Sequence, residues 1–134
     1  MMDDTNTPNP NEEFKYVFGE KEELVIILFY GNLDAKAIPT LEKCGLELKE
    51  KTQPVVLLSF RELLSLKPPA HPDFAKFQKN IRDSNKRIGV CGFRPDVKEL
   101  LVLKGIVRGG EIFNNVSEAW QALSQNKNSK IKNI

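Results

Sequence analysis

The chain has 134 residues, with 20 Lys and Arg against 18 Asp and Glu and a formal net charge of +2. This length suits one domain around one hydrophobic core. The near balance of charge argues against strong nucleic-acid binding, which relies on a concentrated basic face. The two cysteines stand outside any CxxC pair, which argues against a disulfide framework or a zinc site. No apolar run reaches the roughly 18 residues of a membrane span, and the N-terminus lacks the pattern of a secretory signal. We therefore expect a cytoplasmic protein that neither binds nucleic acid nor inserts into a membrane.

The first third of the chain predicts two strands and a helix. Residues 1–12 are rich in Asn, Pro, Asp and Thr, so we expect a disordered arm there. Phe14–Phe18 alternates apolar and polar residues like a short edge strand, and Leu24–Tyr30 is a continuous apolar run like a strand buried on both faces. Gly31–Asp34 interrupts this pattern. Apolar residues then recur every three or four positions from Ile38 to Leu48, which predicts a helix.

The rest of the chain alternates strands and helices. The expected elements are a buried strand at Val55–Leu58, a loop at Arg61–Phe74, a helix to about residue 85, a core strand at Arg87–Phe93, a helix from Pro95, a short extended piece with Ile112 and Phe113, and a last helix capped by Asn115. Helices between apolar strands predict an α/β fold with a mixed, mostly parallel central sheet of four or five strands and about four helices. We expect one domain over 13–124 and a polar tail over 125–134.

Residues that could carry catalysis are few. His71 is the only histidine, and a general base needs an orienting partner and a nucleophile within reach. Asp73 is near it in sequence, but both residues are better explained as the start of a helix, whose positive end favours the aspartate. Cys44 and Cys91 stand in apolar patterns and are expected to be small buried hydrophobes. The sequence has no glycine-rich phosphate loop and no acid pair placed for a metal or a glycosidase. We expect no enzyme, no metal and no cofactor.

Four stretches together resemble a known family. They are Gly31–Ala35, Pro54–Leu58, Arg87–Val97 and Gly109–Ala119. In this order and spacing the chain resembles a STAS domain, the fold of anti-sigma factor antagonists, over approximately Phe14 to Ser124. Each stretch alone is weak, and GNLDA is the most specific because the family has Gly-x-Leu-Asp there. The resemblance implies a STAS-like fold and a non-enzymatic regulatory protein in bacterial transcription or stress signalling.

The resemblance also implies a phosphorylation switch that this sequence lacks at the usual place. In relatives, the first serine of an Asp-Ser-Ser-Gly sequence at a helix entrance is phosphorylated by a partner anti-sigma kinase, and the added charge opposes docking. An ungapped alignment from Val55 places Leu66–Pro69 at that sequence, with Lys67 at the acceptor serine. We therefore expect no serine switch at this loop. If the loop carries an insertion, Ser65 is an alternative acceptor, and Ser59 is a weaker one.

Two functions remain open, with different sites. The first is binding of a protein partner, an anti-sigma factor, a serine-kinase-like protein or another signalling protein, and its candidate contacts are Asn32, Asp34, Lys67, Pro68, His71 and Asp73. Asp34 has a second interpretation as a helix N-cap. The alternative function is sensing of a small molecule, a nucleotide or a lipid, at a site lined by Phe74 and Phe77, although core packing explains these two residues better.

Overall fold

The computed structural model describes residues 12–132, except for the side chains of residue 96 and residues 125–132. The strands are β1 (Lys15–Lys21), β2 (Leu24–Leu33), β3 (Val55–Ser59), β4 (Leu63–Leu66), β5 (Arg87–Cys91) and β6 (Ile112–Phe113). The helices are α1 (Ile38–Leu48), α2 (His71–Asp83), α3 (Pro95–Leu103) and α4 (Val116–Lys132), with 3₁₀ turns η1 (Ala35–Ala37), η2 (Pro68–Ala70) and η3 (Gly109–Glu111).

The sheet has the order β1–β2–β3–β5–β6, and β4 pairs with β2 outside this path. β1 runs antiparallel to β2, and the ladders β2–β3, β2–β4, β3–β5 and β5–β6 are parallel. The prediction of an α/β fold with a mixed, mostly parallel sheet and about four helices is confirmed. The sheet has six strands rather than four or five, because part of the expected loop is a strand.

That additional strand is β4, and it depends on a bend in β2. Gly31–Asp34 was expected to separate a strand from a helix, but β2 continues to Leu33 with a register shift after Gly31. Gly31 has a φ of +80°, and a Cβ there would lie 2.1 Å from the carbonyl oxygen of Glu13. Only glycine fits this position. The bent end of β2 then pairs in parallel with Leu63–Leu66, the half-buried segment that forms β4.

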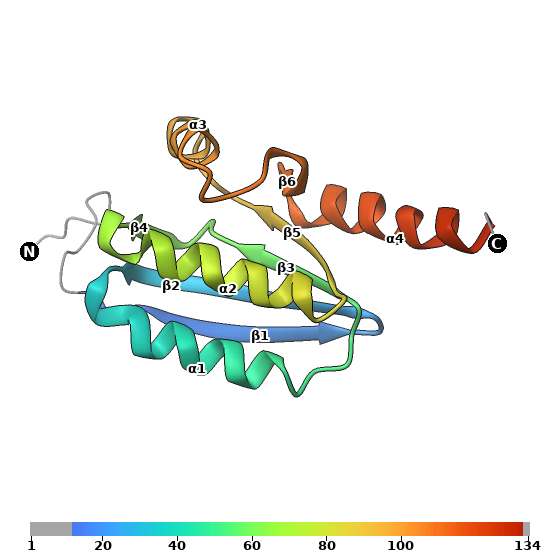
Figure 1. Cartoon of the computed structure of the whole chain (residues 1–134), viewed down its shortest axis with the longest axis horizontal. Helices are drawn as coiled ribbons and strands as arrows, with labels where there is room; N and C mark the ends of the chain where they lie inside the picture. The colour runs from blue at the N-terminus through green and yellow to red at the C-terminus, as the bar shows by residue number, and fades with distance from the viewer. Residues whose placement is uncertain (1–11, 133–134) are drawn as a thin grey trace, which may run out of the picture.

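Helices cover both faces of the sheet. α1 and α2 lie side by side over one face, and α4 runs beside β5 (Figure 1). β2 alternates between the two faces, so that Val25, Ile27 and Phe29 join the larger cluster under α1 and α2. Its residue Leu24 joins a smaller cluster with Leu123 of α4. α3 contributes a buried leucine to the larger cluster, so the described residues form two core clusters, one on each face of the sheet.

The expected helix termini are partly confirmed. Pro39 lies in the first turn of α1, as predicted. Asp34 precedes η1 rather than α1 and makes no side-chain capping hydrogen bond, so the prediction that it caps the helix is wrong. The cap of α4 is confirmed, since Asn115 Oδ1 accepts a 2.8 Å hydrogen bond from the Glu118 N–H. α4 extends to Lys132, beyond the expected domain end at residue 124. Residues 1–11 of the expected disordered arm lie outside the described residues.

Candidate functional site

The predicted partner-binding residues gather at one end of the sheet. The bent end of β2, β4, η2 and the first turn of α2 meet there, because parallel strands place their carboxyl ends at the same edge. η1 lies against η2, which brings Asp34 to the same end of the molecule as Lys67. This end is the position at which proteins with open parallel sheets place their functional loops.

The interior of this end is held by a chain of hydrogen bonds through Asn32. The Ser65 hydroxyl donates to Asn32 Oδ1 at 2.6 Å, and Asn32 Nδ2 donates to the Glu12 carbonyl at 2.9 Å. The backbone N–H of Asn32 donates to the same carbonyl at 3.2 Å. Asn32 is only 5% exposed. Its side chain therefore joins β4 to the segment before β1 and does not face outward.

Ser65 and Ser59, the two alternative phosphate acceptors, both lie in strands. The hydroxyl of Ser65 in β4 donates its hydrogen to Asn32. Ser59 ends the fully buried strand β3 and hydrogen-bonds to the Cys91 thiol. A phosphate on either side chain would place up to two negative charges in a structural contact. Neither serine stands at the entrance of α2.

His71 begins α2 and is also buried, with 6% of its surface exposed. Its Nε2 lies 3.3 Å from the Leu66 carbonyl oxygen, a contact that joins α2 to β4. A general base needs a nucleophile within hydrogen-bond reach of its ring nitrogen. In His71, a backbone carbonyl occupies that place instead. Asp73 lies in the first turn of α2, as the sequence analysis expected, and is half-buried.

Lys67 and Pro68 form the outward-facing part of this end, and both are exposed. The Lys67 backbone N–H donates to the Leu33 carbonyl at 2.9 Å, so the backbone is fixed while the side chain projects. No side chain caps η2 or α2. Prolines at 68, 69 and 72 remove three of the N–H donors that a helix entrance offers to a phosphate.

The two thiols are buried in the core, as the sequence pattern predicted. Cys44 has no exposed surface, and Cys91 is 2% exposed. Burial, with a smaller contribution from Glu47, raises the pKa of the Cys44 thiol from 9.0 to about 12. Burial also raises the pKa of Cys91, and its hydrogen bond with Ser59 opposes this rise. Both thiols stay protonated near neutral pH, which disfavours them as nucleophiles.

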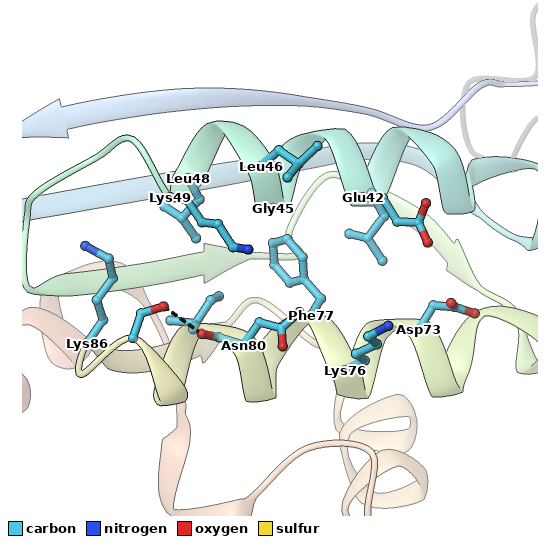
Figure 2. A pocket seen from close by; sticks show the side chains of 13 residues that line it. Glu42, Gly45, Leu46, Leu48, Lys49, Asp73, Lys76, Phe77, Asn80 and Lys86 are labelled. Carbon is cyan, nitrogen blue, oxygen red and sulfur yellow. Dashed lines mark hydrogen bonds between the residues drawn. The ribbon is translucent and has the colours of Figure 1, made fainter.

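A groove between α1 and α2 is a feature that the sequence analysis missed. It has a volume of about 320 Å³, and Figure 2 shows its walls. The buried side chains of Leu41, Phe77 and Ile81 contribute to its lining, and Gly45 leaves an opening above the Phe77 ring. Phe74 has no exposed surface and lies in the core. The signal in the sequence was Gly45, a glycine on the apolar face of a predicted helix.

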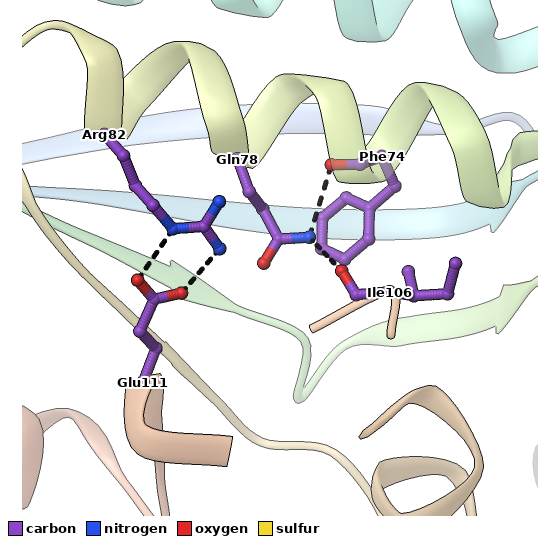
Figure 3. Close-up of polar contacts among 5 residues, drawn as sticks. All are labelled: Phe74, Gln78, Arg82, Ile106 and Glu111. Atoms are coloured by element: carbon purple, nitrogen blue, oxygen red, sulfur yellow. Dashed lines mark hydrogen bonds and ion pairs between the residues drawn. The ribbon is translucent and has the colours of Figure 1, made fainter. Parts of the chain in front are cut away.

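α2 is fixed on its other side by polar contacts with the segment that follows α3, shown in Figure 3. Arg82 forms a bidentate pair with Glu111, with hydrogen bonds of 2.8 Å from Nε and 2.7 Å from Nη2. Gln78 is fully buried, and its Nε2 donates to the Ile106 carbonyl at 2.8 Å. The pair with Glu111 raises the pKa of Arg82. These contacts hold α2 against residues 106–111.

The described residues offer neither a cluster of metal ligands nor a membrane-spanning helix. Between residues 12 and 132, no three or more His, Cys, Asp or Glu side chains gather as metal ligands would. In the same part of the chain, every helix is too short or too polar to cross a lipid bilayer.

Comparisons with known proteins show similarity in structure rather than in sequence. No protein-family model matches the chain, and no curated protein sequence matches it significantly. RsbS from Moorella thermoacetica is 12% identical with a TM-score of 0.72, over 85% of this chain and 98% of that one. An anti-sigma factor antagonist from Mycobacterium paratuberculosis is 13% identical with a TM-score of 0.69, over 84% and 95%. The STAS domain of a SulP transporter from Vibrio cholerae is 14% identical with a TM-score of 0.64, over 83% and 88%.

These similarities span nearly the whole of each solved chain and most of this one. They include anti-sigma factor antagonists and a transporter domain, so proteins with different roles share the architecture. The sheet order and the helices described above agree with them. The chain has the STAS-domain fold, the fold of anti-sigma factor antagonists.

Proposed function

We propose that this chain is a non-enzymatic regulatory module that binds a protein partner and is not switched by serine phosphorylation at its α2 entrance. The observation that carries the proposal is the composition of that entrance. Lys67 and Pro68 are exposed on a fixed backbone, while the nearest serine hydroxyl, that of Ser65, is bonded inward to Asn32. The surface can dock a partner, and it presents no acceptor for a phosphate.

The partner in this proposal is an anti-sigma factor, a serine-kinase-like protein or another signalling protein in the cytoplasm of a bacterium, and the process is regulation of transcription. This choice is supported by the anti-sigma factor antagonists among the solved structures that share this fold. The contact surface consists of Lys67, Pro68 and the half-buried Asp34 and Asp73. Asn32 and His71 support this surface from inside, because their side chains are buried. The similar structures do not favour the small-molecule alternative.

The absence of an enzymatic role is part of the proposal. It is supported by the contacts of the candidate groups, since His71 touches a backbone carbonyl and burial keeps the pKa of the Cys44 thiol near 12. Each of these side chains thus has a structural role. The proposed regulation is binding of the partner, and its extent is set by the abundance of that partner.

The test is affinity capture from native cells with the chain tagged at its C-terminus, and three versions are compared. They are the native chain, Lys67→Glu and the control Lys104→Glu, which reverses an exposed charge after α3. We expect one recurring signalling protein that Lys67→Glu loses and Lys104→Glu keeps. The captured chain should carry no phosphate in intact-mass analysis.

Two results would overturn the proposal. Phosphate mapped to Ser65 or Ser59 would restore the serine switch. Capture of the same protein with equal yield by Lys67→Glu would place the contact elsewhere on the chain.

A further inference from the structure

Gly45 in α1 is not required by the fold of a single copy. Glycine weakens a helix because it gains the most backbone freedom on unfolding. Gly45 is not among the residues with positive φ. A Cβ at this position would lie 3.6 Å from Cδ1 and 3.7 Å from Cε1 of Phe77, which is ordinary van der Waals contact. Neither the backbone nor the core therefore excludes a side chain at position 45.

Next to this opening stands an exposed apolar side chain. Leu46 is 64% exposed and lies at the rim of the groove between α1 and α2. A single exposed leucine is common on protein surfaces. Leu46, however, stands directly beside the unfilled position at Gly45. A large apolar side chain next to such a gap resembles the knobs and holes through which two helices pack against each other.

Two opposite charges flank this pair along α1. Glu42 and Lys49 are both exposed and line the same groove, one toward each end of it (Figure 2). They are seven residues apart, which is about 10 Å along the helix axis, and therefore lie on nearly the same stripe. They are too far apart to pair with each other. The midpoint between positions 42 and 49 falls between Gly45 and Leu46.

The positions of these four residues match a second copy of the same helix. When a second copy of α1 is laid antiparallel across the first about a two-fold axis through that midpoint, Glu42 faces Lys49 of the second copy. The same register places Leu46 over Gly45 of the second copy, and each contact occurs twice, as in any isologous interface. On the other wall of the groove, Asp73 and Lys76 of α2 lie toward the Glu42 end, and Lys86, which follows α2, lies toward the Lys49 end.

We propose that the chain self-associates through α1, as an antiparallel pair of copies related by a two-fold axis between Gly45 and Leu46. The charges of Glu42 and Lys49 are complementary to their own two-fold image, so a second copy pairs both of them. The centre of this interface, at Gly45 and Leu46 in α1, is separate from Lys67 and Pro68, which lie before α2 at the end of the sheet. Asp73 borders both surfaces.

Sedimentation velocity of the full chain from about 1 μM to about 1 mM tests the proposal. We expect a concentration-dependent dimer. Glu42→Lys and Lys49→Glu should each weaken association at least about tenfold, because each reversal creates two like-charge contacts. Leu46→Ser should weaken it as well. Thermal unfolding of each variant confirms that these exposed substitutions leave the fold intact.

A mixing experiment separates this geometry from other dimers. An equimolar mixture of Glu42→Lys and Lys49→Glu should form a heterodimer with native affinity, since both facing pairs are again opposite in charge. The double variant should recover association by itself. The matched control is Lys43→Glu, which makes the same charge change as Lys49→Glu on an exposed position of α1 outside the groove; it should leave association unchanged.

The proposal is overturned if the native chain remains monomeric up to about 1 mM. It is also overturned if the mixture and the double variant fail to recover association. Equal weakening by Lys43→Glu and Lys49→Glu would show a general charge effect instead of this interface.

Discussion

Replacing Gly45 with alanine should stabilise the isolated chain. Gly45 lies three residues before Leu48, the last residue of α1, and its carbonyl accepts a 3.2 Å hydrogen bond from Lys49 N–H. The position is therefore inside the hydrogen-bonded helix. Alanine in place of glycine in a helix gains roughly 0.5–1 kcal/mol from the reduced freedom of the unfolded chain.

The new methyl group adds a smaller contribution through contact with Phe77. It would lie 3.6 Å from the ring, without overlap, and complete burial of one such group contributes about 0.8 kcal/mol. Gly45 is only half-buried, so the expected total is about 1 kcal/mol. With a urea slope of about 1–3 kcal/mol per molar, the midpoint of unfolding should rise by roughly 0.3–1 M.

The assay is urea unfolding followed by circular dichroism at about 1 μM chain, a concentration chosen to keep self-association weak. Leu46→Ala serves as the matched control on α1, since it changes an exposed side chain without changing a glycine. A midpoint for Gly45→Ala equal to or below that of the native chain would refute the reasoning. It would mean that the packing of α1 on α2 needs glycine at position 45, so that a single copy would explain the opening.

Three further predictions concern the interior. Ser65→Ala removes the 2.6 Å hydrogen bond to Asn32 and should cost about 1–2 kcal/mol in urea unfolding; an unchanged midpoint would contradict the structural role of this serine. Arg82→Met leaves the carboxylate of Glu111, 18% exposed, without its bidentate partner and should cost about 1–3 kcal/mol, whereas a loss below about 0.5 kcal/mol would match an ordinary surface pair. Cys44 has its pKa raised from 9.0 to about 12 by burial, so its stabilising contribution is complete below about pH 9 and decreases as the pH rises toward 12, because the unfolded thiol ionises first. The native chain should therefore lose stability more steeply than Cys44→Ala between pH 8 and about 10, and parallel pH profiles would contradict this assignment.

The central strands could be predicted from the sequence because their continuous apolar runs are stable only when both faces are buried. Leu24–Tyr30 and Val55–Leu58 are apolar on both faces, which only a covered parallel sheet accommodates. Leu63–Leu66 was missed as a strand, because four residues carry little periodic signal and their pairing partner is created by a bend in β2. Such a long-range contact is invisible to local patterns.

The arrangement of the candidate contact residues was predicted only in part. The resemblance placed them near the entrance of α2, and the structure brings Lys67 and Asp34 to the same end of the sheet. The burial of Asn32 and His71 could not be read from the sequence, because polar residues are usually exposed and their inward contacts are made with distant segments. The groove at Gly45 required both helices in place.

The hydrogen bonds from Asn32 to Glu12 have a practical consequence for the design of fusion proteins. They fix the entry of the chain into the fold beside β4 and the start of α2, at the end of the molecule opposite to where α4 leaves the sheet (Figure 1). A bulky tag joined just before Glu12 would stand next to Lys67 and obstruct whatever approaches it. A tag placed after α4 points the other way, so pull-down baits and surface-immobilised samples should be attached there.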